Sequence, residues 1–159
     1  MDYESWLNIL DKLKNGYIDN NLLKEMQESE INNNINGMLI LKIDALIRER
    51  FEISISKITK NLTEIFTDIN YLDLTLVNFK KEVKFLIAMS KLKQLPTEKQ
   101  QELINKIKEG TEQVYTILVN ESVNIDPKGI YAQTIINNKV KWSDITWIIT
   151  KQKITLEDI

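Results

Sequence analysis

LILKIDALIRERFEISISKITKNLTEIFTDI, residues 39–69, decides the fold class of this chain. Its apolar residues recur at steps of three and four positions, which places them on one face of an α-helix. The stripe consists of Leu39, Ile43, Leu46, Ile47, Phe51, Ile55, Ile58, Leu62, Ile65 and Ile69. Residues 51–56 also alternate with period two, as strands do, but the helical stripe continues on both sides of them. The stretch predicts one helix of about thirty residues, roughly 45 Å long.

A second long helix is expected after this one. Residues 68–73 are predicted to form a connection, with Asp73 or Thr75 as the N-cap of a helix that ends at Leu95. Pro96 ends it, because the residue before proline resists helical geometry. The inner face is predicted to hold Leu72, Leu76, Phe79, Val83, Leu86, Ile87, Ser90 and Leu95.

A third long helix is predicted to begin at the segment 97–100, Thr-Glu-Lys-Gln, which matches a capping box. Because the link at Pro96 is short, this helix and the preceding one are expected to be antiparallel neighbours. Gly110 falls on the apolar stripe of the third helix, between Ile107 and Val114. The glycine indicates close approach of a neighbouring helix, and simple tolerance of a weak helix former is the alternative.

The N-terminal region predicts two shorter helices. Tyr3, Trp6, Leu7, Leu10 and Leu13 lie at helical spacing over residues 3–14, and Asn15-Gly16 is a typical helix stop. Asp19 is expected to cap the second helix, whose buried side would hold Leu22, Leu23 and Met26. The asparagine-rich segment 32–37 predicts a loop or kink, because asparagine competes for backbone hydrogen bonds and glycine disfavours helix. A continuous helix is the alternative.

The C-terminal segment differs in pattern from the rest. Asp126-Pro127-Lys128-Gly129 is typical of a type I turn. Beyond it, residues 130–136 and 139–142 flank Asn137-Asn138 as in a small β-hairpin, while Ser143-Asp144 would instead cap a helix over residues 145–151. We therefore expect a single all-α domain. Residues 1–125 would form a bundle of three to four long antiparallel amphipathic helices, and residues 126–159 a short appendage packed on it.

The composition disfavours catalysis. The 159 residues include no cysteine and no histidine, so the commonest general base, zinc ligand and thiol nucleophile are all missing. Four glycines form no phosphate-binding motif, and the acidic pairs of the helices lack the histidines of a bundle di-metal site. We predict no catalytic residue, no metal, no cofactor and no enzymatic activity.

Basic charge gathers in one part of the sequence. The net charge is −2, which gives no overall attraction to nucleic acid, and only two of the 21 basic residues are arginine. Lys80, Lys84 and Lys91 nevertheless line one helical stripe, within a lysine-rich surface over residues 80–108. Ordinary solvated lysines are one interpretation. Contact with nucleic-acid phosphates, in an accessory nucleic-acid-binding protein, is the other.

Protein–protein interaction is the leading functional hypothesis. Trp142 and Trp147 are candidate contact residues, since tryptophan is enriched at interface hot spots, although they would equally serve to hold the tail on the bundle. The stripe over residues 39–69 is longer than one compact neighbour needs, so part of it would reach another chain. These features predict a protein partner or a homo-oligomer, in a helical interaction protein or accessory subunit.

The remaining expectations concern location and source. Residues 1–4, Met-Asp-Tyr-Glu, are acidic and unlike a signal peptide, and the longest apolar runs are far shorter than a membrane span. These features predict a cytoplasmic protein with no membrane contact. The excess of Ile, Asn and Lys indicates an AT-rich coding genome, typical of a bacterium or a phage.

Overall fold

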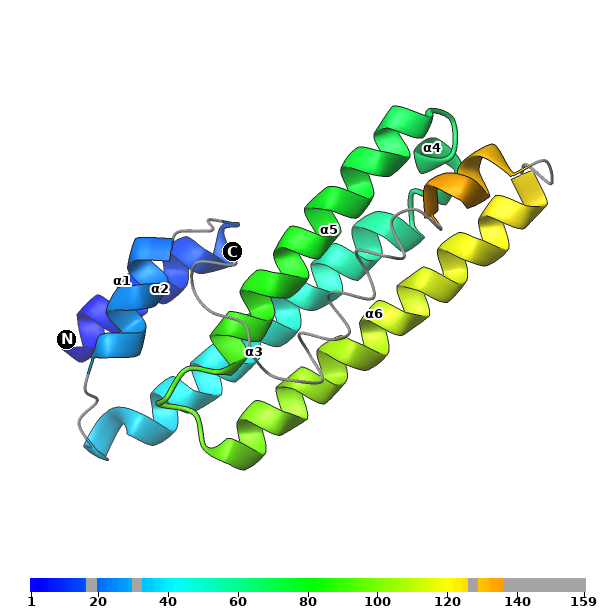
Figure 1. Ribbon diagram of the computed structural model, residues 1–159. Helices are drawn as coiled ribbons and strands as arrows, with labels where there is room; N and C mark the ends of the chain where they lie inside the picture. Colours follow the sequence, from blue (N-terminus) through cyan, green and yellow to red (C-terminus); the bar gives the residue numbers. More distant parts are fainter. Residues whose placement is uncertain (17–19, 30–32, 126–128, 136–159) are drawn as a thin grey trace.

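The computed structural model describes residues 1–16, 20–29, 33–125 and 129–135, and over these ranges it contains helices and no strand (Figure 1). Three long helices, α3, α5 and α6, lie side by side, and α5 runs antiparallel to the other two. The shorter α1 and α2 lie beside one end of these three rods. The all-α prediction is confirmed. The elements are α1 (Tyr3–Lys14), α2 (Asn20–Glu28), α3 (Asn33–Thr59), α4 (Leu62–Ile65), α5 (Ile69–Ser90) and α6 (Thr97–Ile125), followed by a short helix over residues 130–135.

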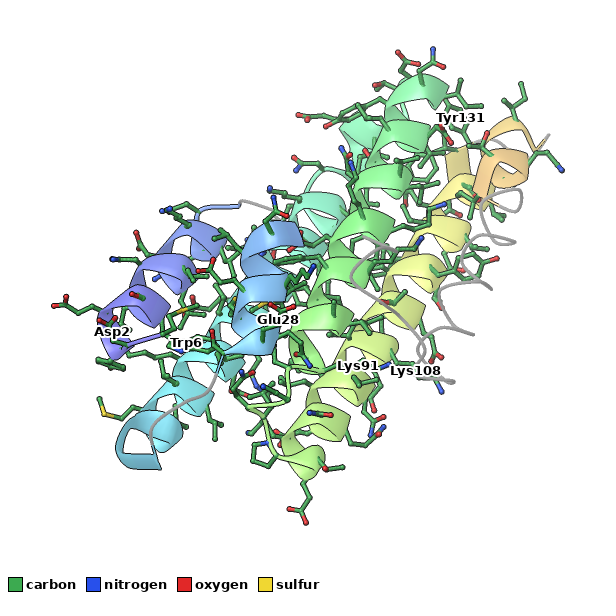
Figure 2. The ribbon with its side chains drawn as sticks, turned by 60° about the vertical axis from the view of Figure 1, so that its left-hand side comes forward. Asp2, Trp6, Glu28, Lys91, Lys108 and Tyr131 are labelled. Atoms are coloured by element: carbon green, nitrogen blue, oxygen red, sulfur yellow. The ribbon has the colours of Figure 1, made fainter. Side chains whose placement is uncertain are left out.

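The first helix has the predicted bounds, and its N-cap is Asp2. The Asp2 carboxylate accepts the backbone N–H of Ser5 at 2.8 Å, and this bond lowers the pKa of the carboxyl group below its ordinary value. Gly16 follows the helix with φ +95°, a left-handed conformation that favours glycine. Trp6 is fully buried where α1 packs on α3 (Figure 2). The predicted cap Asp19 lies outside the described residues.

The predicted bounds of the central helix were wrong at both ends. α3 already begins at Asn33, so the loop expected over residues 33–37 is helical. Asparagine is tolerated there because N–H groups in the first helical turn have no intrahelical partner to lose. The helix ends at Thr59 rather than Ile69. Just beyond, the Asn61 amide donates to the carbonyl of Lys57 at 2.8 Å, and the separate helix α4 begins at Leu62.

The next helix begins earlier and ends earlier than predicted. Its N-cap is Asp68, whose carboxylate accepts the N–H of Asn70 at 2.9 Å, so neither Asp73 nor Thr75 is the cap. α5 ends at Ser90, and residues 91–95 form turns in which Leu92 and Leu95 are buried. All eight residues predicted for its inner face are buried, seven of them on α5 and the eighth, Leu95, in the turn that follows.

The start of α6 lies where the sequence predicted it, but the capping contacts differ from a capping box. The N–H of Gln100 donates to the carbonyl of Pro96 at 2.9 Å, rather than to the Thr97 side chain. The Gln100 side chain does reach back, and its amide donates to the carbonyls of Leu92 and Leu95 at 3.0 Å each. The glutamine therefore fixes the turn that joins α5 to α6.

Gly110 allows α3 and α6 to approach closely, as predicted. A Cβ atom at this position would lie 2.6 Å from Phe51 Cζ and 3.1 Å from Ile55 Cδ1, both on α3. The Phe51 ring in turn stacks on Phe79 of α5, with 6.5 Å between centroids. The absence of a side chain at Gly110 thus leaves room for an aromatic pair at the centre of the three long helices.

The described part of the C-terminal segment is helical, so the first strand of the predicted hairpin was wrong. Ile135 is fully buried, and the Tyr131 ring packs edge-on against Phe66 at 5.6 Å. Tyr131 and Ile135 are four positions apart and share one helical face. Tyr131 lies at the end of the molecule opposite Asp2 (Figure 2). The turn at residues 126–128 and the alternatives for residues 137–159 lie outside the described residues.

Candidate interaction groove

The predicted basic stripe is not a continuous exposed surface. Lys80 is only 9% exposed, and Lys84 and Lys91 are half-buried. Burial also lowers the pKa of Lys91, because desolvation disfavours its charged form. These placements do not favour the nucleic-acid interpretation, which needs accessible cations along one face. Trp142 and Trp147 lie outside the described residues.

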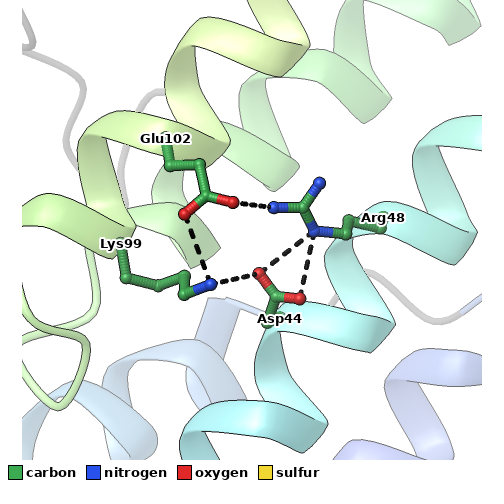
Figure 3. Close-up of polar contacts among 4 residues, drawn as sticks. All are labelled: Asp44, Arg48, Lys99 and Glu102. Atoms are coloured by element: carbon green, nitrogen blue, oxygen red, sulfur yellow. Dashed lines mark hydrogen bonds and ion pairs between the residues drawn. The ribbon is translucent and has the colours of Figure 1, made fainter.

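The first of the two arginines is held in an ion-pair network between α3 and α6 (Figure 3). Arg48 Nε donates to both oxygens of Asp44, at 3.1 and 3.0 Å, and Arg48 Nη2 pairs with Glu102. Lys99 Nζ lies 3.4 Å from each of the same two carboxylates. Partial burial alone would lower the pKa of Arg48, but the hydrogen bonds and charges of the two acids outweigh it and raise that pKa.

The second arginine joins three helices from a buried position. Arg50 is 6% exposed, and its Nε and Nη2 atoms each donate to a Glu82 oxygen at 2.7 Å. Arg50 Nη1 donates to the carbonyl of Leu13 at the end of α1, also at 2.7 Å. Its guanidinium lies 4.4 Å from the centre of the Phe85 ring. Arg50 and Glu82 therefore stabilise the junction of α1, α3 and α5, and the sequence did not indicate this role.

One of the hollows on the described surface is a groove between α3 and α5, which Ile65 of α4 also lines. Its volume is about 450 Å³. Residues from each long helix recur along it at helical spacing: Ser54, Lys57, Ile58 and Asn61 on α3, and Tyr71, Leu74, Thr75, Asn78 and Glu82 on α5. Buried Ile58, Ile65 and Phe79 also line it and form its apolar base. We call this hollow the α3–α5 groove.

Exposed apolar side chains border this groove on the α5 side. Tyr71 is 43% exposed and Leu74 is 54% exposed, and both line the groove. Val77, 39% exposed, lies three positions further along the same helix. Single exposed apolar residues are ordinary, but three at this spacing form a contiguous stripe. The sequence carried a signal for them, since they are the apolar residues of 70–79 that lie off the predicted inner face.

The long apolar stripe of the sequence, in contrast, is mostly buried within this chain, with Leu62 and Ile69 partly exposed. Its α3 members are buried within the protein apart from Ile55, which is half-buried and packs on the core. A homo-oligomer stays a prediction, and burial of these residues does not favour the stripe as its contact surface. Exposed apolar side chains remain on α3 as well, where Leu41 is 69% and Ile53 is 53% exposed, but the exposed apolar residues that line the α3–α5 groove, Tyr71 and Leu74, belong to α5.

Neither a metal-binding cluster nor a membrane-spanning helix is present in the part of the chain that the structure describes. No cluster there of three acidic, histidine or cysteine side chains could hold a metal ion. None of the helices described is both long and apolar enough to cross a membrane. The cytoplasmic location and the bacterial or phage source stay predictions. Comparison with known proteins finds no matching family model, no matching curated protein and no matching solved structure.

Proposed function

We propose that this protein is a non-catalytic helical binding protein that docks a partner protein in the α3–α5 groove. The observation that supports this most is the exposed stripe of Tyr71, Leu74 and Val77 beside a groove with an apolar base. Contiguous apolar surface bordered by polar residues is typical of protein interaction sites. The lack of histidine and cysteine in the whole sequence supports binding rather than catalysis.

The rigidity of the surrounding structure supports the same proposal. Both walls of the groove belong to long helices, and these are joined beneath it by the Phe51–Phe79 stack and by the Arg50–Glu82 pair. A groove whose walls are already fixed loses little conformational entropy on binding. A partner would then gain most of its affinity from burying Leu74 and Tyr71.

Site-specific photo-crosslinking in the cells that produce the protein tests this function. A benzophenone amino acid replaces Leu74 in the groove, or Leu41 as a matched control. Leu41 is 69% exposed on α3 and does not line the groove. We expect one adduct of defined mass from position 74, which Tyr71→Asp removes, and none from position 41. Equal adducts at both positions, or no adduct at position 74, would contradict the proposal.

A further inference from the structure

The length of the α3–α5 groove matches about three turns of a helix. The α5 wall runs from Tyr71 to Glu82, which is about 16 Å of helix, or three turns. No β-sheet edge exists in the described residues to which a strand could add. A helix lying along such a groove contacts it through residues at positions i, i+3, i+4 and i+7, and the apolar base formed by Ile58, Ile65 and Phe79 suits these anchors.

The charge of the groove favours a partner of one sign. Lys57 on α3 and Lys81 on α5 line it, both exposed, and neither makes an ion pair among the described residues. Glu82 is the one acidic residue lining it in the described chain, and its two oxygens are already bound by Arg50 at 2.7 Å. The groove therefore presents two available positive charges on a protein whose net charge is −2.

Resting on the proposed function, we infer that the partner of the α3–α5 groove is an amphipathic helix whose apolar face is bordered by Asp or Glu residues. Its apolar anchors cover Leu74 and Tyr71, and its acidic borders pair with Lys57 and Lys81. Charges at the rim of an interface act mainly on partner choice and association rate, while the apolar centre supplies affinity. Lys57 and Lys81 thus determine which partner binds, and Leu74 and Tyr71 supply most of the affinity.

The first test measures binding of designed peptides to the whole protein by fluorescence anisotropy. The probes are two helical peptides of about twenty residues. Both carry leucine at i, i+3, i+4 and i+7, and the borders of the leucine face are Glu in one peptide and Lys in the other. We expect the Glu-bordered peptide to bind at least about tenfold more tightly, and this preference to shrink in high salt. Equal binding of the two peptides would overturn the inference.

Charge reversal gives the second test. Lys57→Glu with Lys81→Glu should exchange the preference, so that the Lys-bordered peptide binds about tenfold more tightly. Lys106→Glu is the matched control, because Lys106 is exposed on α6 and is not among the residues that line the groove. It should leave the preference unchanged. Circular dichroism melting confirms that each variant is folded. A preference that survives the double reversal would overturn the inference.

Leu74→Asp separates the inference from the function on which it rests. If this variant abolishes binding of both peptides while charge reversal has no effect, the groove binds helices without charge selection. The proposed function then stands, and the acidic partner is wrong. If the Glu-bordered peptide fails to bind wild-type protein at about millimolar concentration, while crosslinking at position 74 persists, the inference alone is wrong. If peptide binding and crosslinking both fail, the two proposals fall together.

Discussion

The two halves of α5 differ in how completely the rest of the chain covers them. From Phe85 to Ser90 six consecutive residues are buried, so this half is enclosed on every side of the helix. Between Ile69 and Val77, buried residues alternate with exposed apolar ones, and the exposed set borders the α3–α5 groove. The same helix is therefore a core element at its C-terminal end and a surface element at its N-terminal end.

The difference separates what the fold needs from what it leaves for binding. A helix enclosed on all sides requires neighbours around its whole circumference, and α3 and α6 both pack on α5. At the other end, Leu74 and Val77 add little to the core, since most of their surface stays in water. Glu82 lies between the two halves, where it lines the groove and also binds the buried Arg50.

The largest expected effect comes from Glu82→Gln at this boundary. The substitution removes the charge of the carboxylate that accepts two hydrogen bonds from the buried Arg50 guanidinium, and breaking such a pair costs about 3–5 kcal/mol of stability. Glu102→Gln is the matched control, because Glu102 is 55% exposed in its pair with Arg48 and should lose about 1 kcal/mol or less. Urea unfolding measures both. Similar losses for the two variants would contradict the enclosure of the Arg50 junction.

Replacing the buried pair by apolar residues sharpens this prediction. Arg50→Met combined with Glu82→Met removes both charges of the pair, so neither of these two charges is left unpaired in the interior. Such exchanges are often neutral or stabilising. We expect the double variant to recover most of the stability that Glu82→Gln loses. A double variant as unstable as Glu82→Gln would show that the bond from Arg50 to the Leu13 carbonyl matters more than the ion pair.

The next prediction applies one substitution to both halves of the helix. Leu86→Ala in the enclosed half should destabilise the protein by about 2–5 kcal/mol, because Leu86 is fully buried. Leu74→Ala in the exposed half should change stability by only about 0.5 kcal/mol. The effect on binding should have the opposite order. Leu74→Ala should lower the affinity for the Glu-bordered peptide more than Leu86→Ala does. Urea unfolding measures the stability of the two variants, and fluorescence anisotropy measures their affinity for the peptide. Equal losses of unfolding free energy would refute the difference between the two halves of α5.

The sequence predicted the helices well because the helical stripe is a local property. The bounds of α1 matched, and the seven positions predicted for the inner face that lie on α5 are all buried. The break after Thr59 escaped prediction because Leu62 and Ile65 continue the apolar spacing although the chain has changed direction. The deciding contact, from Asn61 to the Lys57 carbonyl, interrupts the helix without interrupting the pattern.

The candidate site was less predictable, because it depends on contacts between distant residues. Arg50 meets Leu13 and Glu82 across 37 and 32 positions of sequence, and no local pattern indicates such a junction. The lysines of residues 80–108 formed a stripe in sequence, but Lys80 faces neighbouring structure and is buried. Leu74 and its neighbours were recognisable only as apolar residues off the inner face, and the groove beside them requires α3.

An intermediate effect is expected from Gly110→Ala, which tests the aromatic pair beneath the groove. The added methyl group would contact Phe51 and displace it against Phe79, a residue that lines the groove. Overpacking of this kind costs about 1–3 kcal/mol. Phe51→Leu in the same chain should return part of that loss by making room. Urea unfolding of the single and double variants measures this coupling, and strictly additive losses would contradict the contact.

The smallest expected effect is at Lys91, the C-cap of the enclosed half. Burial lowers the pKa of Lys91 in the folded protein, so the unfolded chain binds more protons as the pH approaches the ordinary lysine pKa. The free energy of unfolding therefore gains a contribution that rises with pH in the range just below the ordinary lysine pKa. Below that range the cost of burying the charge persists. Lys91→Met should remove both the cost and the rise.

Urea unfolding at several pH values measures this contribution against Lys106→Met, which replaces an exposed lysine on α6. Relative to that control, Lys91→Met should be more stable at neutral pH, and the advantage should shrink as the medium becomes alkaline. The pH dependence of this difference follows from the burial of Lys91. A lysine fully in water would have the same pKa in the folded and unfolded states, so its replacement would give no stability advantage that depends on pH. If the difference in unfolding free energy between the two variants did not change with pH, Lys91 would behave as an exposed lysine, and the prediction would be wrong.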